Sequence, residues 1–220
     1  MRSTTTRRIV LAGLAAGCVA GCAALPPLSL DEAVRRLMRK AVLRALARLD
    51  APGGVWDRFI ARLDLPRELG PAGFALAAAL TSEAFHRQLD AWLRPVLLRA
   101  ARNAAPRLSA AIRAIGIANA RAVLHGGPHA AIDLLRSDMG PALIEAMVPE
   151  LKTALGTLDD PALRPLIVII ATLGGEALAR ALARHADQAL WDQMAEEEAA
   201  IRADPGADGD PQLAGALAAP

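Results

Sequence analysis

The chain has 220 residues, of which 54% are hydrophobic and only 3% aromatic, and its formal net charge is +2. This length suffices for one domain with a sizeable buried core, and a composition rich in alanine and leucine favours helices over strands. Scarce aromatic residues weaken the case for a surface that stacks nucleobases. The charge falls to −1 without Arg2, Arg7 and Arg8, which lie in a segment that we expect to be removed, so we expect no binding to nucleic acid.

Residues 1–21 have the three parts of a bacterial export signal in the required order. The three arginines come first, and an apolar stretch over residues 9–20 follows that is too short to span a bilayer comfortably. Small residues then lead to Cys22. We predict a signal peptide over residues 1–21; a signal peptide without lipidation and an uncleaved anchor helix are the alternatives.

The segment Val19-Ala20-Gly21-Cys22 resembles the lipobox of bacterial lipoproteins. This resemblance implies that Cys22 receives acyl chains, such as palmitate, and becomes the first residue of the mature protein. Cys18, which follows Ala15-Ala16-Gly17, is the second choice for lipidation. Residues 22–28 then form a lipid-anchor linker that Pro26 and Pro27 stiffen. The membrane is thus an expected partner, reached through the lipid anchor.

The residues around the cysteine also bear on export and location. Ala23 stands where an inner-membrane retention signal often has Asp, so we expect the periplasmic face of the outer membrane rather than the inner membrane. The segment Thr6-Arg7-Arg8-Ile9-Val10-Leu11 resembles a twin-arginine export motif. Twin-arginine and general secretory export both remain open.

The first helix of the mature chain is predicted to begin at Ser29, because Ser29 and Glu32 have the spacing of a capping box. Apolar residues then recur with helical periodicity at Leu30, Ala33, Val34, Leu37, Met38, Ala41, Ala45 and Leu49. Five cations lie off this stripe: Arg35, Arg36, Arg39, Lys40 and Arg44. We favour a core helix with a solvated basic face over a helix that lies on anionic headgroups.

The remaining chain predicts a single multi-helix bundle with kinked helices over residues 29–205. Helices are expected from Ser82 to about Asn103, with a kink at Pro95, and from Pro106 toward Ile115. Further helices are expected over 118–124, from Pro128 to Arg136 and from Gly140-Pro141 to about Gly156. The last runs from Glu176 to Ala203, and a break near His185 is left open. The apolar run over 166–173 predicts a buried helix end. Residues 206–220, rich in Gly, Ala, Asp and Pro, are expected to form a disordered tail.

Four stretches over residues 29–205 have the character of family motifs: Ile60–Leu69, Leu98–Pro106, Ala120–Ala131 and Trp191–Pro205, the last with Ala195-Glu196-Glu197-Glu198 and Ile201-Arg202. In the same order, they resemble segments of a bacterial family catalogued as domain of unknown function 4197. The resemblance implies a helical fold and an exported, often lipid-linked protein. It implies no activity and no catalytic residue.

The segment His125-Gly126-Gly127-Pro128-His129 is the most suggestive candidate site. Two His four residues apart, with Asp133 beyond, bind zinc when they share a helix face, but the glycines and the proline interrupt any helix here. We therefore predict no metal and a helix–turn–helix corner, in which glycine supplies positive φ and Pro128 begins the next helix. His125, Gly126, Gly127 and His129 are the predicted contacts to a ligand or partner, because loops often provide function.

The acidic segment Glu196-Glu197-Glu198 does not predict a paired carboxylate site, because consecutive helical residues point about 100° apart. Glu198 and Arg202 are four residues apart, and they predict an ion pair that supports the helix by a few tenths of a kcal/mol. No nucleophile elbow, phosphate-binding loop or Cys-containing metal motif occurs in the sequence. We expect no catalytic residue and no cofactor.

The leading hypothesis is a lipid-anchored helical protein of the envelope that acts as a non-enzymatic interaction or ligand-binding module. An envelope protein or an apolar small molecule is the expected partner. A periplasmic carrier of an apolar ligand is one alternative, and it predicts a continuous apolar cavity between helices. A hydrolase near the Gly126-Gly127 turn is another, and it predicts a buried acid or His of perturbed pKa in a deep pocket.

Overall fold

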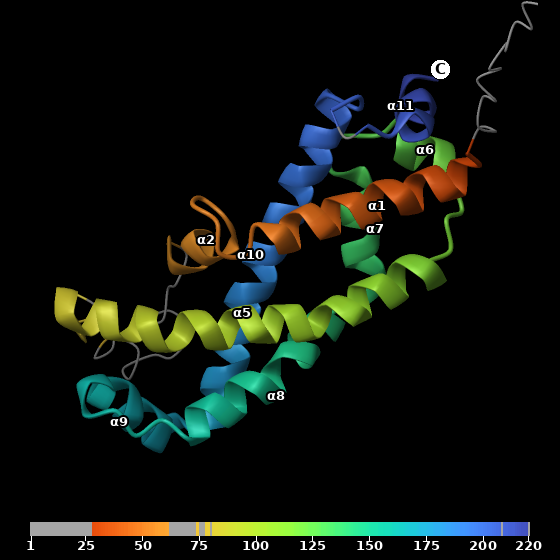
Figure 1. The fold of residues 1–220 in the computed structure, drawn as a ribbon. Helices are drawn as coiled ribbons and strands as arrows, with labels where there is room; N and C mark the ends of the chain where they lie inside the picture. The colour runs from red at the N-terminus through yellow and green to blue at the C-terminus, as the bar shows by residue number, and fades with distance from the viewer. Residues whose placement is uncertain (1–27, 62–73, 75–77, 80, 208, 220) are drawn as a thin grey trace, which may run out of the picture.

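The computed structural model describes residues 28–61, 74, 78–79, 81–207 and 209–219. Its helices are α1 (Leu30–Ala47), α2 (Val55–Ala61), α5 (Glu83–Ala114), α6 (Ala120–Leu124), α7 (Ala130–Met139), α8 (Ala142–Gly156), α9 (Arg164–Leu173), α10 (Gly175–Ala203) and α11 (Pro211–Ala218), with a 3-10 turn η1 at Pro161–Leu163 (Figure 1). These residues include no strand, so the predicted all-α class is confirmed. The predicted signal peptide, Cys18, Cys22 and most of the linker lie outside the described residues.

The long helix α10 is the element around which the others pack. It contacts α1, α2, α7, α8 and α9, and Figure 1 shows it running behind α1 and α5. Its buried residues include a series of alanines, which allow neighbouring helices to approach closely, and also Asp187, Gln193, Glu197 and Glu198. The helix continues without a break through His185.

Helix α1 begins at the predicted cap, where the Ser29 hydroxyl accepts a hydrogen bond from the Glu32 amide at 3.2 Å. Its predicted apolar stripe, apart from the half-buried Leu30, is buried against α5, α6, α7 and α10. The cations of α1 are less exposed to solvent than we expected, because several of them bind partners elsewhere in the fold. Arg35 donates to the carbonyl of Ile115 at 3.0 Å, and Arg36 pairs with Asp210 at 3.3 Å.

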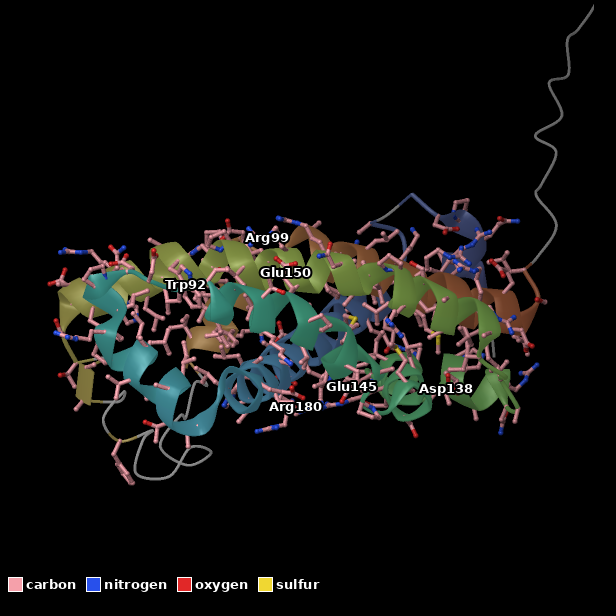
Figure 2. All side chains as sticks on the ribbon, turned by 90° about the horizontal axis from the view of Figure 1, so that it is seen from below. Trp92, Arg99, Asp138, Glu145, Glu150 and Arg180 are labelled. Atoms are coloured by element: carbon pink, nitrogen blue, oxygen red, sulfur yellow. The ribbon has the colours of Figure 1, made fainter. Side chains whose placement is uncertain are left out.

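Helix α5 is one continuous helix of 32 residues, whereas the sequence predicted a break before Pro106. Proline inside a helix costs roughly 3 kcal/mol, yet both Pro95 and Pro106 lie within α5. Burial compensates for this cost, because the apolar stripe continues across both prolines and packs mainly on α8. Ion pairs border this layer: Arg99 and Glu150 join α5 to α8 at 2.9 Å, and Arg180 and Glu145 join α10 to α8 (Figure 2).

Helix α9 contains the apolar run over 166–173, which we expected to be buried. Leu166 and Ile169 are buried, but Val168 is 57% exposed. Gly174 ends the helix with φ of 84°, a left-handed conformation that favours glycine. Among the described residues no single helix is both long and apolar enough to cross a membrane. The segments Pro161–Leu173 and Gly175–Ala203 meet that test only as a pair and only by length and composition, and the chain bends by 113° between them.

The carboxy-terminal segment differs from the predicted disordered tail over 206–220. Residues 211–218 form helix α11, which the Asp210 side chain caps by accepting from the Leu213 amide at 3.1 Å. Leu213 is buried, and Asp210 pairs with Arg36 and Lys40 of α1. A composition rich in Gly and Asp concealed this helix, because its stability comes from contacts with α1 rather than from local propensity.

Candidate functional site

The predicted corner lies between α6 and α7, over residues 125–129. Asn119 caps α6 by accepting from the Ala122 amide at 3.1 Å, and α7 begins at Ala130 rather than at Pro128 as predicted. The prediction of positive φ is also wrong, because neither Gly126 nor Gly127 is among the positive-φ glycines. Gly126 is instead a position where the Ala122 carbonyl and the Ala130 side chain come too close to leave room for a Cβ atom.

An ion pair on α10, between the buried Glu198 and the mostly buried Arg202, holds this corner. The Glu198 side chain is fully buried, and its two oxygens accept from the backbone amides of Ala131 at 3.0 Å and Ile132 at 2.7 Å. Arg202 donates from Nε to Glu198 at 2.8 Å, and it also donates to the carbonyls of Val123, at 2.9 Å, and of Leu124. The two side chains therefore bond the end of α6 and the start of α7 at once.

The polarity of this arrangement follows from the helix termini. The first amides of a helix lack intrahelical acceptors and the last carbonyls lack donors, so a carboxylate suits the start of α7 and a guanidinium the end of α6. The spacing of Glu198 and Arg202 predicted an ion pair, and the structure brings them together. The spacing did not predict the hydrogen bonds from this pair to α6 and α7, and these bonds make the pair part of the tertiary fold.

Each glutamate of the acidic segment binds a different part of the fold, as their 100° separation on the helix allows. Glu196 forms a two-point pair with Arg58 of α2. Glu197 is buried and accepts from Gln193 at 2.8 Å and from Arg48, the residue that follows α1, at 3.3 Å. Together with Glu198, these contacts connect α10 to α2, α1 and the corner.

A polar cleft of about 330 Å³ lies between α2, α7 and α10. Its lining residues are Arg58, His129, Ile132, Asp133, Arg136, Trp191, Asp192, Ala195 and Glu196. His129 Nδ1 lies 2.9 Å from the carbonyl oxygen of Ala195, so this nitrogen is the donor. Nε2 of the neutral ring is then an acceptor.

One wall of the cleft is held rigid by a chain of contacts along α7 and α10. The Arg136 guanidinium lies over the Trp191 ring, 5.9 Å from its centroid, and donates to Gln188 at 2.7 Å. Gln188 in turn donates to Asp192 at 2.8 Å. On its other side the Trp191 indole donates to Asp187 at 2.8 Å, and burial raises the pKa of the Asp187 carboxyl above its ordinary value.

His125 lies elsewhere, in an open hollow of about 680 Å³ on the other side of the corner. This hollow is lined by Leu124, His125, Gly126, Pro128, Ala199, Arg202, Ala203, Pro205, Leu217 and Ala218. The structure thus separates the two histidines of the predicted motif. In the part of the chain that the structure describes, no three His, Cys, Asp or Glu side chains are close enough to share a metal ion.

The cleft is suited to holding a polar molecule. Its lining offers guanidinium donors, carboxylate acceptors and the apolar ring of Trp191, but no hydroxyl or thiol side chain. Asp187, the buried acid of raised pKa, lines neither hollow. A hydrolase predicts a buried acid or His of perturbed pKa inside the pocket, and Asp187 does not fulfil this prediction because it lies outside both hollows.

The close packing of Gly126 predicts that Gly126→Ala destabilises the protein. An added Cβ would lie 2.7 Å from the carbonyl oxygen of Ala122 and 2.9 Å from Ala130 Cβ, and we expect a loss of about 1–3 kcal/mol in free energy of unfolding. Gly127→Ala is the matched control, because its Cβ would meet nothing within 4 Å. Equal stability of the two variants in urea denaturation would contradict this account of the corner.

Asp187 generates a prediction on pH and stability. Since its pKa is raised in the folded protein, the folded state binds more protons, and this group lowers stability as pH rises from its unfolded pKa of about 3.9 through its higher folded pKa. Asp187→Asn keeps an acceptor for Trp191 and removes the charge, so its stability relative to wild type should increase from about pH 3 to about pH 7. Asp187→Ala leaves the indole unpaired and should cost about 1–3 kcal/mol. Equal losses in both variants at neutral pH would be inconsistent with this role.

Comparison with known proteins agrees with the resemblance in the sequence. No curated protein and no solved structure matches the chain. A family model, described as a protein of unknown function (DUF4197), matches residues 25–215. The match includes the corner, the acidic segment of α10 and most of α11, and the chain therefore belongs to the DUF4197 family.

Proposed function

We propose that the protein is a lipid-anchored, non-enzymatic binding protein of the cell envelope, which holds a small polar ligand in the cleft between α2, α7 and α10. The observation that supports it most is the convergence of charged and aromatic side chains on this one hollow. Its volume of about 330 Å³ lies within the range of small-molecule sites, about 300–1,000 Å³.

The balance of charge in the cleft indicates the class of ligand. Two cations, Arg58 and Arg136, lie with the carboxylates of Asp133, Asp192 and Glu196. A multiply charged anion or cation finds little net attraction in such a mixture, because each approach meets both signs. A zwitterion or a neutral polar molecule fits better, with His129 Nε2 as an acceptor.

We favour binding over catalysis because the cleft residues are mutually engaged and their side chains include no hydroxyl or thiol nucleophile. The bidentate pair of Arg58 and Glu196 and the stacked Arg136 make a prearranged wall. Prearranged groups lower the entropy cost of binding a ligand. No observation in the described residues favours the hydrolase alternative.

The anchor and the location are part of the proposal, and the amino-terminal sequence supports them. The lipobox-like segment ending at Cys22 implies acylation, and the residue after it favours the outer membrane. The bundle begins at Ser29, six residues after Ala23, so the domain stays close to the membrane that holds the acyl chains.

An apolar ligand in the second hollow is the rival reading, and a specific observation supports it. Leu124, Pro128 and Leu217 give this hollow of about 680 Å³ a partly apolar lining. An envelope protein that inserts an apolar side chain there is a related possibility. Because Arg202 and His125 also line it, this hollow is not the continuous apolar cavity that a dedicated carrier requires.

Native mass spectrometry of the protein isolated from envelopes in mild detergent tests the ligand. We expect a bound small molecule in wild type and in His125→Ala, and its loss in His129→Ala and Arg136→Ala. Loss in His125→Ala alone would assign the ligand to the second hollow. Absence of any ligand in wild type, with no thermal shift on adding the polar fraction of an envelope extract, would refute the binding proposal.

Peptide mass spectrometry of the same preparation tests the anchor separately. The proposal expects an amino-terminal peptide that begins at Cys22 and carries acyl groups. An intact Met1, or an unmodified thiol at position 22, would remove the anchor while leaving the cleft experiment interpretable.

A further inference from the structure

The carboxy-terminal half of α5 and the corner after it form a basic region of the chain. The sequence has no Asp or Glu between Asp90 and Asp133, and that interval contains six arginines: Arg94, Arg99, Arg102, Arg107, Arg113 and Arg121. Arg102, Arg107 and Arg113 are exposed, and we call these three residues the basic face. We infer that the basic face docks on the anionic headgroups of the membrane to which the chain is tethered.

The basic face differs from the other charged surfaces of the described chain in lacking counter-charges. Many other surface cations have carboxylate partners, such as Arg87 with Glu83, Arg99 with Glu150 and Arg180 with Glu145. Arg164 of α9 is exposed and has no such partner among the described residues, but it is a single charge rather than a group. None of the three basic-face arginines forms an ion pair with any carboxylate of the described residues. Their charges are therefore open to an external anion.

The spacing of the arginines suits an extended surface rather than a compact ligand. Arg102 and Arg113 are eleven residues apart on α5, about three helical turns, so they lie on the same side of the helix roughly 16 Å from each other. Arg107 lies between them along the axis, about 140° around the helix from Arg102, at the other edge of the exposed side of α5. No hollow described above is lined by these side chains.

The fold places this face near the point where the chain emerges from its anchor. Arg35 of α1 donates to the carbonyl of Ile115, two residues after Arg113, at 3.0 Å. Figure 1 shows the start of α1 and the end of α5 at the same end of the bundle. Residues 22–27 span at most about 20 Å, so this end stays at the membrane if Cys22 is acylated, which is the one respect in which the inference rests on the proposed function.

The cations of α1, which the sequence suggested as the headgroup contact, are less suited to this role. Arg36 and Lys40 pair with Asp210, Arg39 pairs with Glu32, and Arg44 lies beside Glu197. A basic residue near an anionic surface contributes attraction worth about a fivefold increase in binding, so three residues give a factor on the order of 100. Such attraction is screened by salt.

Vesicle sedimentation of the unacylated mature chain, residues 23–220, tests the inference without the anchor. The probes are vesicles of phosphatidylcholine alone and of phosphatidylcholine with phosphatidylglycerol in equal parts. The test variant combines Arg102→Gln, Arg107→Gln and Arg113→Gln. The control combines Arg87→Gln on the first turns of α5, Lys152→Gln on α8 and Arg164→Gln on α9, which removes the same charge from outside the basic face. Circular dichroism and thermal unfolding establish that both variants fold as wild type does.

We expect wild type to bind only the anionic vesicles, and to be released by high salt. The test variant should lose binding by a factor on the order of 100, while the control stays near wild type. An equal loss of vesicle binding in both variants would mean that binding depends only on the net charge of the protein, and it would overturn the proposal. Absence of any preference for anionic vesicles would overturn it too, and would leave an acidic protein as the occupant of this face. Neither result depends on acylation of Cys22, so failure of the anchor is recognised separately.

Discussion

The fold depends on one buried carboxylate, that of Glu198, which has no access to solvent and must find its partners inside the protein. Two amides of α7 and the guanidinium of Arg202 supply them, and Arg202 bonds the last carbonyls of α6 in turn. Removing one partner of a buried charge pair leaves the other uncompensated, which is far more costly than losing a surface pair. The corner between α6 and α7 is therefore specified by α10 rather than by its own sequence.

This constraint also shapes the candidate site. The turn of α10 that contains Glu198 contains Glu196, which with Arg58 lines the cleft, and Ala195, whose carbonyl orients His129. The acidic segment by which the family resemblance was recognised thus has a structural task, and the cleft is formed beside it. The clamped corner, the cleft that we propose as the ligand site and the basic face that we propose as the membrane contact are thus formed by different residues.

Periodicity and capping predicted much of the fold from sequence. The first helix, its Ser29 cap, the helix ending at Gly156 and the long helix α10 all follow from local patterns. The misses came from contacts between distant residues: burial on α8 keeps α5 continuous through Pro106, and contacts with α1 stabilise α11. The histidine motif indicated the right corner, but the turn directs His125 and His129 to different hollows. Arg58, Arg136 and Trp191 were not identified as cleft residues, because no spacing in the sequence brings α2, α7 and α10 together.

A double-mutant cycle on Glu198 and Arg202, with alanine at each and at both, tests the central claim most directly. The free energy of unfolding in urea should give a coupling energy of about 2–3 kcal/mol, as for residues of one buried network. A parallel cycle on Arg58 and Glu196, whose carboxylate side chain is 54% exposed, should give less than about 1 kcal/mol. A coupling between Glu198 and Arg202 no larger than that of the exposed pair would contradict the claim that this pair holds the corner.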